Sequence, residues 1–314
     1  MFNIQKVFAD EIVIENNYIF LADESSSENQ AQTNKVFSEK WTKSRERVDT
    51  LAEFQKKWYL ELYGFNDEKD LSSFLRKKKV IFDAGCGLGY KAAWFAELAP
   101  ESTVIGMDFS EAANIASQKY NYENLYFCRG DIAHTGMKEG EIDYVSCDQV
   151  IHHTENPEET FKPLSSLLAS QGEFACYVYK KKALPRELLD DYFRDFSKTL
   201  SNEELWELAE QVTELGRRLD SLDCEIDVPE IPALGIKEGR LPIQRFIYWN
   251  FMKCFWNKDL GKDISVDTNF DWYSPSNAYR YTKEEFLDFA KKNNLETTFL
   301  HEEDACYSGR FLNK

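Results

Sequence analysis

Residues Val80–Tyr90 read VIFDAGCGLGY, an apolar run that passes directly into a glycine-rich turn. The apolar run predicts a buried strand, and the pattern after it predicts a helix. Glycine is required between the two, because the backbone must turn sharply and let a ligand approach without a Cβ in the way. The spacing G-x-G-x-G differs from the G-x-G-x-x-G of dinucleotide binding, and no G-K-[ST] for nucleoside triphosphates is present. Such a turn is a weak signal by itself, so the neighbouring segments have to support it.

Strand-like and helix-like segments alternate around this turn, which implies crossover connections and a parallel sheet covered on both faces. Strands are expected at residues 78–85, 102–110, 124–131, 142–148 and 172–180, and then at 296–300 and 305–311. Helices are expected at 90–98, 111–120, 157–168 and 282–293, after a helical stretch over 45–74. We therefore predict an α/β fold with a doubly wound, Rossmann-like, mainly parallel seven-stranded sheet.

Four segments are expected along the chain. Residues 1–34 form a small β-hairpin and a linker, because the polar run DESSSENQAQTN at its end cannot bury enough surface to order itself. Residues 35–182 form the core, and 183–281 form a helical cap insertion, since the alternation stops there. Residues 282–314 complete the sheet. Within the insertion, helices are expected at 185–219 and 241–256, and the stretch FDWYSPSNAYRY (270–281) is expected to be a loop.

Three acids follow three successive predicted strands: Asp83, Asp108 and Asp131. Open α/β sheets bind ligands at the carboxyl ends of their strands, and a carboxylate after the second strand can accept both hydroxyls of a ribose. The alternative is structural, because Asp83 can stabilise its turn and Asp108 can cap the helix that follows.

The segments DAGCGLGY (83–90), the strand-end Asp108, Gly130-Asp131 and VIHHT (150–154) together resemble a class I S-adenosylmethionine-dependent methyltransferase. The match spans about residues 80–180, and the aromatic segments of the insertion are similar to those of bacterial enzymes of this class. The resemblance implies a transferase whose cofactor is S-adenosyl-L-methionine. It places Asp83 and the three glycines around the methionine part, Asp108 at the ribose, Asp131 and Ile132 at the adenine, and Gln149 and Val150 beside the sulfonium. The complete set of cofactor-binding residues that we predict is Asp83, Gly85, Cys86, Gly87, Gly89, Asp108, Phe109, Asp131, Ile132, Gln149 and Val150.

The catalytic candidates are His153 and His152, which directly follow the fourth predicted strand. Methyl transfer from a sulfonium requires alignment, exclusion of water and sometimes removal of a proton. Histidine titrates near neutral pH, so one of the pair can act as general base for a hydroxyl or amine acceptor. The alternative is that these histidines pack against the loop or hydrogen-bond to it.

The acceptor is expected to meet aromatic and cationic side chains. Two tyrosines end the fifth predicted strand, two aromatics lie in the predicted loop, and a guanidinium can grip a carboxylate or phosphate with two hydrogen bonds. The substrate candidates are Tyr177, Tyr179, Arg245, Trp272, Tyr273 and Arg280. The alternatives are that the aromatics form the core of the insertion and that the arginines form surface ion pairs.

The composition of the chain bears on which partners the protein can bind. The formal net charge of −17, with 55 acidic against 38 basic residues, opposes binding to nucleic acid. No apolar run is long enough to span a membrane, and the amino terminus does not look like a signal peptide, so we expect a cytoplasmic protein. The seven cysteines show no C-x-x-C pair or zinc-finger spacing, so no metal site is predicted. The amphipathic helix expected at 203–218 has a solvated charged face, or else it forms a homodimer surface.

Three functions remain in competition. A methyltransferase for a small-molecule acceptor explains both the cofactor residues and the aromatic insertion. A protein methyltransferase requires an open groove in place of a closed pocket. A non-catalytic binding or scaffold protein of the same fold is a further alternative, although the glycines and the ribose acid that such a protein can lose are all present here.

Overall fold

The computed structural model describes residues 3–21, 28–43 and 48–314. The chain divides into two compact units. Unit 1 comprises residues 1–180 and 279–314, and unit 2 comprises residues 181–278. Each unit is described separately below.

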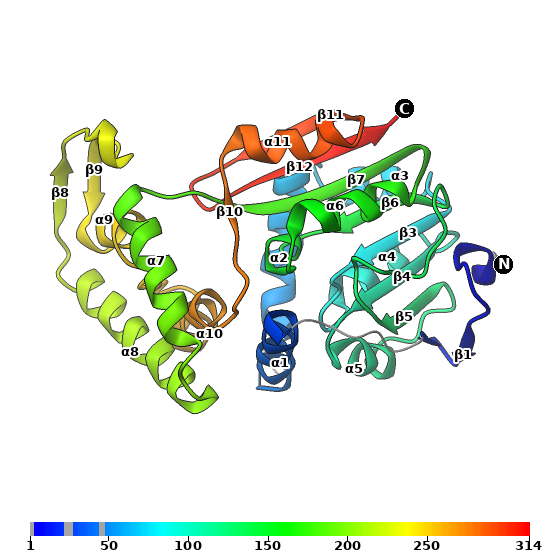
Figure 1. The fold of residues 1–314 in the computed structure, drawn as a ribbon, viewed down its shortest axis with the longest axis horizontal. Coiled ribbons are helices and arrows are strands. Elements are labelled where there is room, and N and C mark those ends of the chain that lie inside the picture. The colour runs from blue at the N-terminus through cyan, green and yellow to red at the C-terminus, as the bar shows by residue number, and fades with distance from the viewer. Residues whose placement is uncertain (1–2, 22–27, 44–47) are drawn as a thin grey trace. The chain divides into compact units, whose positions relative to one another are not determined.

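Unit 1 is built on one large sheet (Figure 1). The strands are β1 (Val13–Glu15), β2 (Tyr18–Phe20), β3 (Val80–Ala84), β4 (Thr103–Asp108), β5 (Leu125–Arg129), β6 (Ile142–Cys147), β7 (Leu168–Lys180), β10 (Arg280–Tyr281), β11 (Leu295–Glu302) and β12 (Cys306–Asn313). Their order is β1-β2-β5-β4-β3-β6-β7-β12-β11, with β10 beside β7. Strands β2 to β7 pair in parallel, whereas β12 runs antiparallel to β7 and β11 antiparallel to β12. The predicted doubly wound, mainly parallel sheet is confirmed.

Helices cover this sheet on both faces. They are α1 (Glu28–Lys43), α2 (Val48–Tyr63), α3 (Glu68–Leu75), α4 (Tyr90–Leu98), α5 (Ala112–Lys119), α6 (Pro157–Ser166) and α11 (Lys283–Lys292), with 3-10 turns η1 (Ile4–Val7) and η2 (Ile151–His153). Successive side chains of a strand point to opposite faces. Accordingly, Val80 and Phe82 of β3 pack in a core shared with α6 and α11, whereas Ile81 packs in a second core shared with α2, α3 and α4.

The sheet contains more than the seven predicted strands. The expected amino-terminal hairpin is present, but it is not a separate appendage. Strand β2 pairs in parallel with β5, and the side chain of Ile19 is fully buried there. Strand β10 pairs with β7 as well. The hairpin therefore extends the edge of the core sheet.

The linker prediction for residues 23–34 is wrong over its second half, because α1 begins at Glu28. Thr33 and Val36 of this helix are buried, so packing against unit 1 stabilises a segment whose polar composition alone would not. The first half of the predicted linker lies outside the described residues. The helical stretch predicted at 45–74 is two helices, since Gly64 adopts φ +70° and interrupts it.

Unit 2 consists of four helices and a two-stranded hairpin within the described residues. They are α7 (Leu184–Ser197), α8 (Asn202–Asp220), β8 (Glu225–Val228), η3 (Pro232–Leu234), β9 (Gly239–Pro242), α9 (Ile243–Asn250) and α10 (Gly261–Tyr273). The helical stretch predicted at 185–219 consists of two helices, α7 and α8. Ser201 caps α8: its side chain accepts from Glu204 N, and the Glu204 side chain accepts from Ser201 N.

Two aromatic segments of unit 2 differ from prediction. The helix expected at 241–256 ends at Asn250, and the backbone that follows is held by buried amides: Gln244 donates to Cys254 O (2.9 Å), and Asn269 accepts from Phe255 N (2.8 Å). Conversely, Phe270 lies in helix α10 and not in a loop, and its ring stacks on Trp206 at 3.8 Å between centroids. Tertiary contacts decide both cases, since local propensity is weak in these segments.

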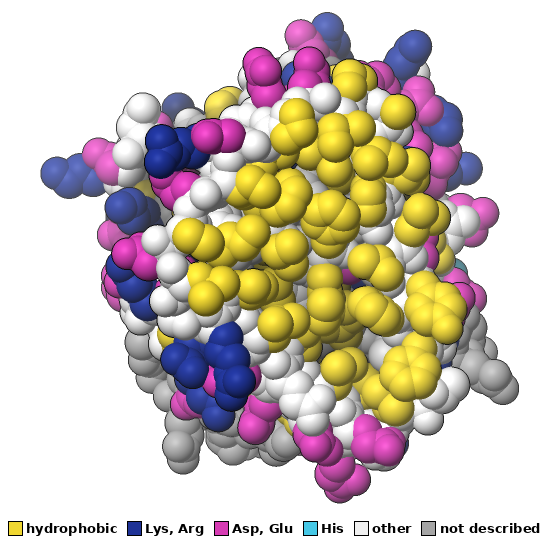
Figure 2. Space-filling model, turned by 90° about the vertical axis from the view of Figure 1, so that its left-hand side faces the viewer, with side chains coloured by type: hydrophobic (Ala, Val, Ile, Leu, Met, Phe, Trp, Pro, Cys, Tyr) yellow, Lys and Arg dark blue, Asp and Glu magenta, His cyan; other side chains and the backbone are white. Residues whose placement is uncertain are grey.

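Helix α7 presents an apolar stripe to solvent. Leu184, Leu188, Tyr192 and Phe196 lie four residues apart and are 48, 64, 71 and 53% exposed. The opposite face buries the charged residues Arg186, Asp190 and Arg194. Figure 2, which shows the left-hand side of the view in Figure 1, has many apolar side chains gathered on that face.

The described residues bear on what the sequence predicts about membrane spans and cysteines. No helix among the described residues has the length and apolar character needed to cross a membrane. Six cysteines are buried free thiols, and Cys224 is exposed.

Candidate cofactor-binding site

The order of the strands places a binding site next to β3. From β3 the chain adds β4 and then β5 on one side of the sheet. It then returns to the other side of β3 and adds β6 and β7, so the strand order reverses between β3 and β6. Open α/β sheets bind ligands at the carboxyl ends of the strands at such a point. The glycine turn leaves β3 at this end, and Asp148 follows β6 there.

The glycine turn is closely packed. Gly85 adopts φ +81°, and a Cβ there would lie 2.4 Å from the Val150 methyl groups. Gly89 adopts φ +77°, and its Cβ would lie 2.6 Å from that of Ala116. Both positions require glycine, because the backbone conformation and the neighbouring side chains leave no room for a Cβ.

Asp108 holds this turn in place. Its Oδ2 accepts from Gly87 N (2.8 Å), and its Oδ1 accepts from the Ser110 backbone N (2.9 Å) and hydroxyl (2.6 Å). Burial raises the pKa of Asp108, although these hydrogen bonds oppose the rise. Asp108 does not cap helix α5, whose N-cap is Glu111, but it has a structural role in the glycine turn. Ribose binding by the same carboxylate remains a prediction.

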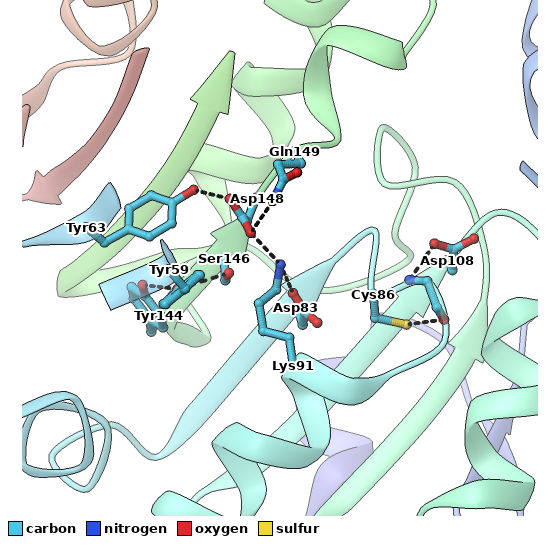
Figure 3. A network of polar contacts seen from close by, with 11 residues as sticks. Tyr59, Tyr63, Asp83, Cys86, Lys91, Asp108, Tyr144, Ser146, Asp148 and Gln149 are labelled. Carbon is cyan, nitrogen blue, oxygen red and sulfur yellow. Dashed lines mark hydrogen bonds and ion pairs between the residues drawn. The ribbon is translucent and has the colours of Figure 1, made fainter. Parts of the chain in front are cut away.

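A buried charged cluster lies behind the turn (Figure 3). The Nζ of Lys91, in the first turn of α4, is 3.1 Å from Asp148 Oδ2 and 3.5 Å from Asp83 Oδ1. Tyr63 donates to Asp148 Oδ1 at 2.9 Å. We call Asp83, Lys91 and Asp148 the acidic cluster. It contains two carboxylates and one ammonium, so it has one negative charge in excess when both acids are ionised.

Asp83 is the unsatisfied member of the acidic cluster. It is fully buried, and neither carboxylate oxygen has a hydrogen-bond partner among the described residues, apart from the long ion pair with Lys91. Burial raises the pKa of Asp83 to about 6, against the attraction of Lys91. Burial by itself would lower the pKa of Lys91, but Asp148 and Asp83 raise it. An orphaned carboxylate beside a glycine turn suits a ligand that carries a cationic group, such as the ammonium and sulfonium of S-adenosylmethionine.

Sequence reasoning missed several residues of this region. Lys91 has a local signal, a lone lysine in the apolar helix YKAAWFAEL, and Asp148 is a fourth acid after a strand. Tyr63 has none, since it comes from α2, 85 residues away from its partner. Helix α1 contributes Trp41, whose ring would lie 3.0 Å from a Cβ on Gly87, and Phe37, whose ring contacts that of His153 at 5.1 Å.

The remaining predicted cofactor residues each have contacts within the protein. Asp131 accepts from Ala133 N (2.9 Å), Ile132 is buried in the core, and the Phe109 carbonyl accepts from Arg129 (3.3 Å). Cys86 is buried, which raises its pKa. Gln149 adopts φ +63°, rare for a non-glycine residue, and its amide lies 3.4 Å from Asp148. Their roles toward the cofactor remain predictions.

The two histidines lie with the tyrosines at the end of β7. His152 and His153 form η2 and are both buried. The ring of His152 lies 3.9 Å from that of Tyr179, and His153 Nε2 is 3.5 Å from Tyr179 Oη. Tyr177 is buried beside His152 at 5.6 Å, and Arg280 is the register partner of Tyr179 in the sheet.

The other substrate candidates belong to unit 2. Arg245 lies over the Tyr248 ring at 5.5 Å. Trp272 is buried with Lys253 over its ring at 4.3 Å, and Tyr273 donates to the Lys253 carbonyl at 2.8 Å. The structure thus divides the six candidates between the units, three in each.

Comparison with known proteins identifies the type of domain. Residues 75–221 match a family model described as a methyltransferase domain. An uncharacterized protein of Synechococcus sp. (strain ATCC 27144) is 29% identical over 104 residues, which are 32% of this chain and a quarter (25%) of that protein's length.

Solved structures of methyltransferases resemble the fold at low identity. Magnesium protoporphyrin IX methyltransferase from Synechocystis PCC 6803 is 14% identical with a TM-score of 0.42, covering 93% of this chain and 90% of that one. A S-adenosylmethionine-dependent methyltransferase from Aquifex aeolicus is 11% identical with a TM-score of 0.43, covering 85% and 98%. The match of residues 75–221 therefore identifies a methyltransferase domain in this chain, in agreement with the resemblance of its glycine turn and strand-end acids.

Proposed function

We propose that this protein transfers the methyl group of S-adenosylmethionine to a small-molecule acceptor. The observation that carries the proposal is the acidic cluster, which holds an orphaned buried carboxylate, Asp83, directly behind a glycine turn at the reversal point of the sheet. When bound, the cofactor supplies a methyl carbon on a positively charged sulfur. The excess negative charge of the cluster favours such a ligand, and the turn lets it approach the backbone.

The residues of η2 are the candidates for proton removal. A hydroxyl or protonated amine acceptor must lose one proton as its oxygen or nitrogen binds the methyl carbon. In the proposal His153 takes that proton on Nδ1, while Tyr179 Oη, 3.5 Å from Nε2, orients the ring, and His152 is the alternative base. The hydrogen bond from Tyr279 N to His152 O (2.9 Å) holds η2 against the chain that enters β10.

Titration with S-adenosylmethionine and S-adenosylhomocysteine tests the proposal, with Asp108→Ala as the variant. We expect micromolar binding to the parent protein. The variant loses two sets of hydrogen bonds that hold the turn, so its affinity should fall about tenfold, which corresponds to about 1.4 kcal/mol. Asp227→Ala, a change to a carboxylate of unit 2, is the control. Absence of binding to either compound would instead favour the non-catalytic scaffold protein.

We also propose that two copies of the chain associate through the apolar stripe of α7. Laid antiparallel on itself, the stripe pairs Leu184 with Phe196 and Leu188 with Tyr192, so that one patch serves both partners of a two-fold interface. Half-exposed side chains of this size contribute about 100 Å² each, so the four side chains of the stripe supply about half of the area that each partner buries in a standard interface. Asp191 and Asp195 are exposed on the same helix and oppose contact with an anionic membrane.

Sedimentation velocity measures this association. The parent protein should sediment as a dimer at micromolar concentration, and Leu188→Asp/Tyr192→Asp should sediment as a monomer with unchanged binding of S-adenosylhomocysteine. Tyr122→Asp changes an exposed aromatic of unit 1 and is the matched control. A monomeric parent protein, or a dimer that survives the double change, would contradict the proposed interface.

A further inference from the structure

Unit 2 contains a buried ammonium without an ionic partner. Lys253 lies between α9 and α10, and only 7% of the residue is exposed. Its Nζ lies 4.3 Å from the centroid of the Trp272 ring. Among the residues that the structure describes, no carboxylate lies within 4.0 Å of this nitrogen. A charged amine in such surroundings is costly unless an anion compensates it.

A second cation lies over the same aromatic ring. The Arg186 guanidinium is 5.1 Å from the Trp272 centroid and 5.3 Å from that of Tyr248, and it is almost fully buried. Arg186 Nε donates to Asp190 Oδ2 at 2.7 Å. The other oxygen of Asp190 is buried and has no hydrogen-bond partner in the described part of the chain. Lys253, Arg186 and Asp190 together have one positive charge in excess.

Burial and the neighbouring charges shift the pKa of Lys253. Burial lowers the pKa of Lys253 to about 7, and the nearby charges of Arg186 and Lys182 lower it as well. Asp271 of α10 and Asp190 of α7 act in the opposite direction without overcoming the effect of burial. A bound anion would favour the charged form of the amine, against the effect of burial.

We propose that Lys253 and Arg186 form a binding site for the carboxylate of a small organic anion. The excess of one positive charge suits a singly charged anion better than a doubly charged one. The rings of Trp272 and Tyr248 beside the cations suit a ligand with a planar apolar body. The site is built from unit 2 residues alone, so it does not depend on the proposed methyl transfer.

Benzoate, a planar carboxylate, is the probe for this site, and inorganic phosphate is the comparison. Binding is followed by tryptophan fluorescence or calorimetry at pH 6.0 and pH 8.5. Because benzoate binds the protonated amine, its affinity should fall about thirtyfold between these two pH values for a pKa of about 7. Phosphate lacks a planar apolar body to lie against Trp272 and Tyr248, so it should bind at least tenfold more weakly than benzoate at pH 6.0.

Two variants separate charge from packing. Lys253→Met should lose benzoate binding, whereas Lys253→Arg keeps the charge at both pH values and should bind benzoate with little pH dependence. Lys262→Met, at an exposed lysine of α10, is the matched control and should behave as the parent protein. If the parent protein binds no benzoate, if Lys253→Met binds it normally, or if phosphate binds more tightly, the carboxylate site is wrong and Lys253 is a neutral packing residue.

Binding of S-adenosylhomocysteine shows whether the Lys253→Met variant keeps its fold and keeps the proposed cofactor site. Lys253→Met should retain it, because the predicted cofactor residues all belong to unit 1. Loss of benzoate binding with retained S-adenosylhomocysteine binding therefore supports the anion site. A parent protein that binds benzoate but not S-adenosylhomocysteine would leave the anion site standing and overturn the proposed methyl transfer.

Discussion

Replacing Lys91 by methionine should destabilise the protein by about 3–5 kcal/mol, the usual cost of removing one partner from a buried ion pair. Lys91 is 5% exposed and is the cation that lies between the carboxylates of Asp83 and Asp148. Without it, the two buried acids repel each other, and one must take up a proton. The loss should therefore grow as the pH rises above 6. Urea denaturation at pH 6.0 and pH 8.0 measures it.

Lys292 provides a matched control on the surface. It too bridges two carboxylates, Glu158 (2.6 Å) and Asp288 (3.0 Å), but its side chain is 51% exposed. Lys292→Met should change the stability little, since water and salt screen exposed pairs. The double variant Lys91→Met/Asp148→Asn should recover part of the loss, because only one carboxylate remains to be buried. Equal stabilities for Lys91→Met and the parent protein would show that the acidic cluster is not a coupled buried network.

Asp83→Asn should weaken the binding of S-adenosylmethionine about hundredfold at pH 8.0, or about 2.8 kcal/mol. In the proposed site, the ionised carboxylate of Asp83 stabilises the cationic cofactor, and asparagine removes that charge while keeping the shape. The parent protein should also lose affinity in acid. With a pKa of about 6 in the free protein, protonation of Asp83 should reduce the affinity about fourfold between pH 8.0 and pH 5.5.

The sign of this effect follows from the direction of the pKa shift. Burial raises the pKa of Asp83 above its usual 3.8, so the carboxyl is protonated as the pH falls through 6, and the protonated form lacks the charge that binds a cation. Calorimetric titration at several pH values measures the affinity, and the Asp83→Asn variant should show a flat profile over this range. An equally steep pH profile in the variant would assign the titration to a different group.

Local patterns were enough to predict the centre of unit 1. The glycine turn follows a strand and opens a helix at residues 90–98 as expected, because its conformation depends on residues that are adjacent in the chain. The alternation of strands and helices likewise predicted the parallel sheet, since crossover connections leave few other arrangements. The resemblance of these same segments to methyltransferases pointed to the family.

Long-range contacts decided what the sequence alone could not. The acidic cluster brings together residues from β3, α4 and the end of β6, and Tyr63 joins it from α2. Helix α1 is polar in composition and is stabilised by burial of a few side chains, so no local pattern predicts it. In unit 2, the amides of Gln244 and Asn269 satisfy a non-helical backbone that looks helical in sequence. The sequence thus determined the sheet and its glycine turn through local conformation, whereas burial and hydrogen bonds between distant segments decided the charged clusters and the helices around them.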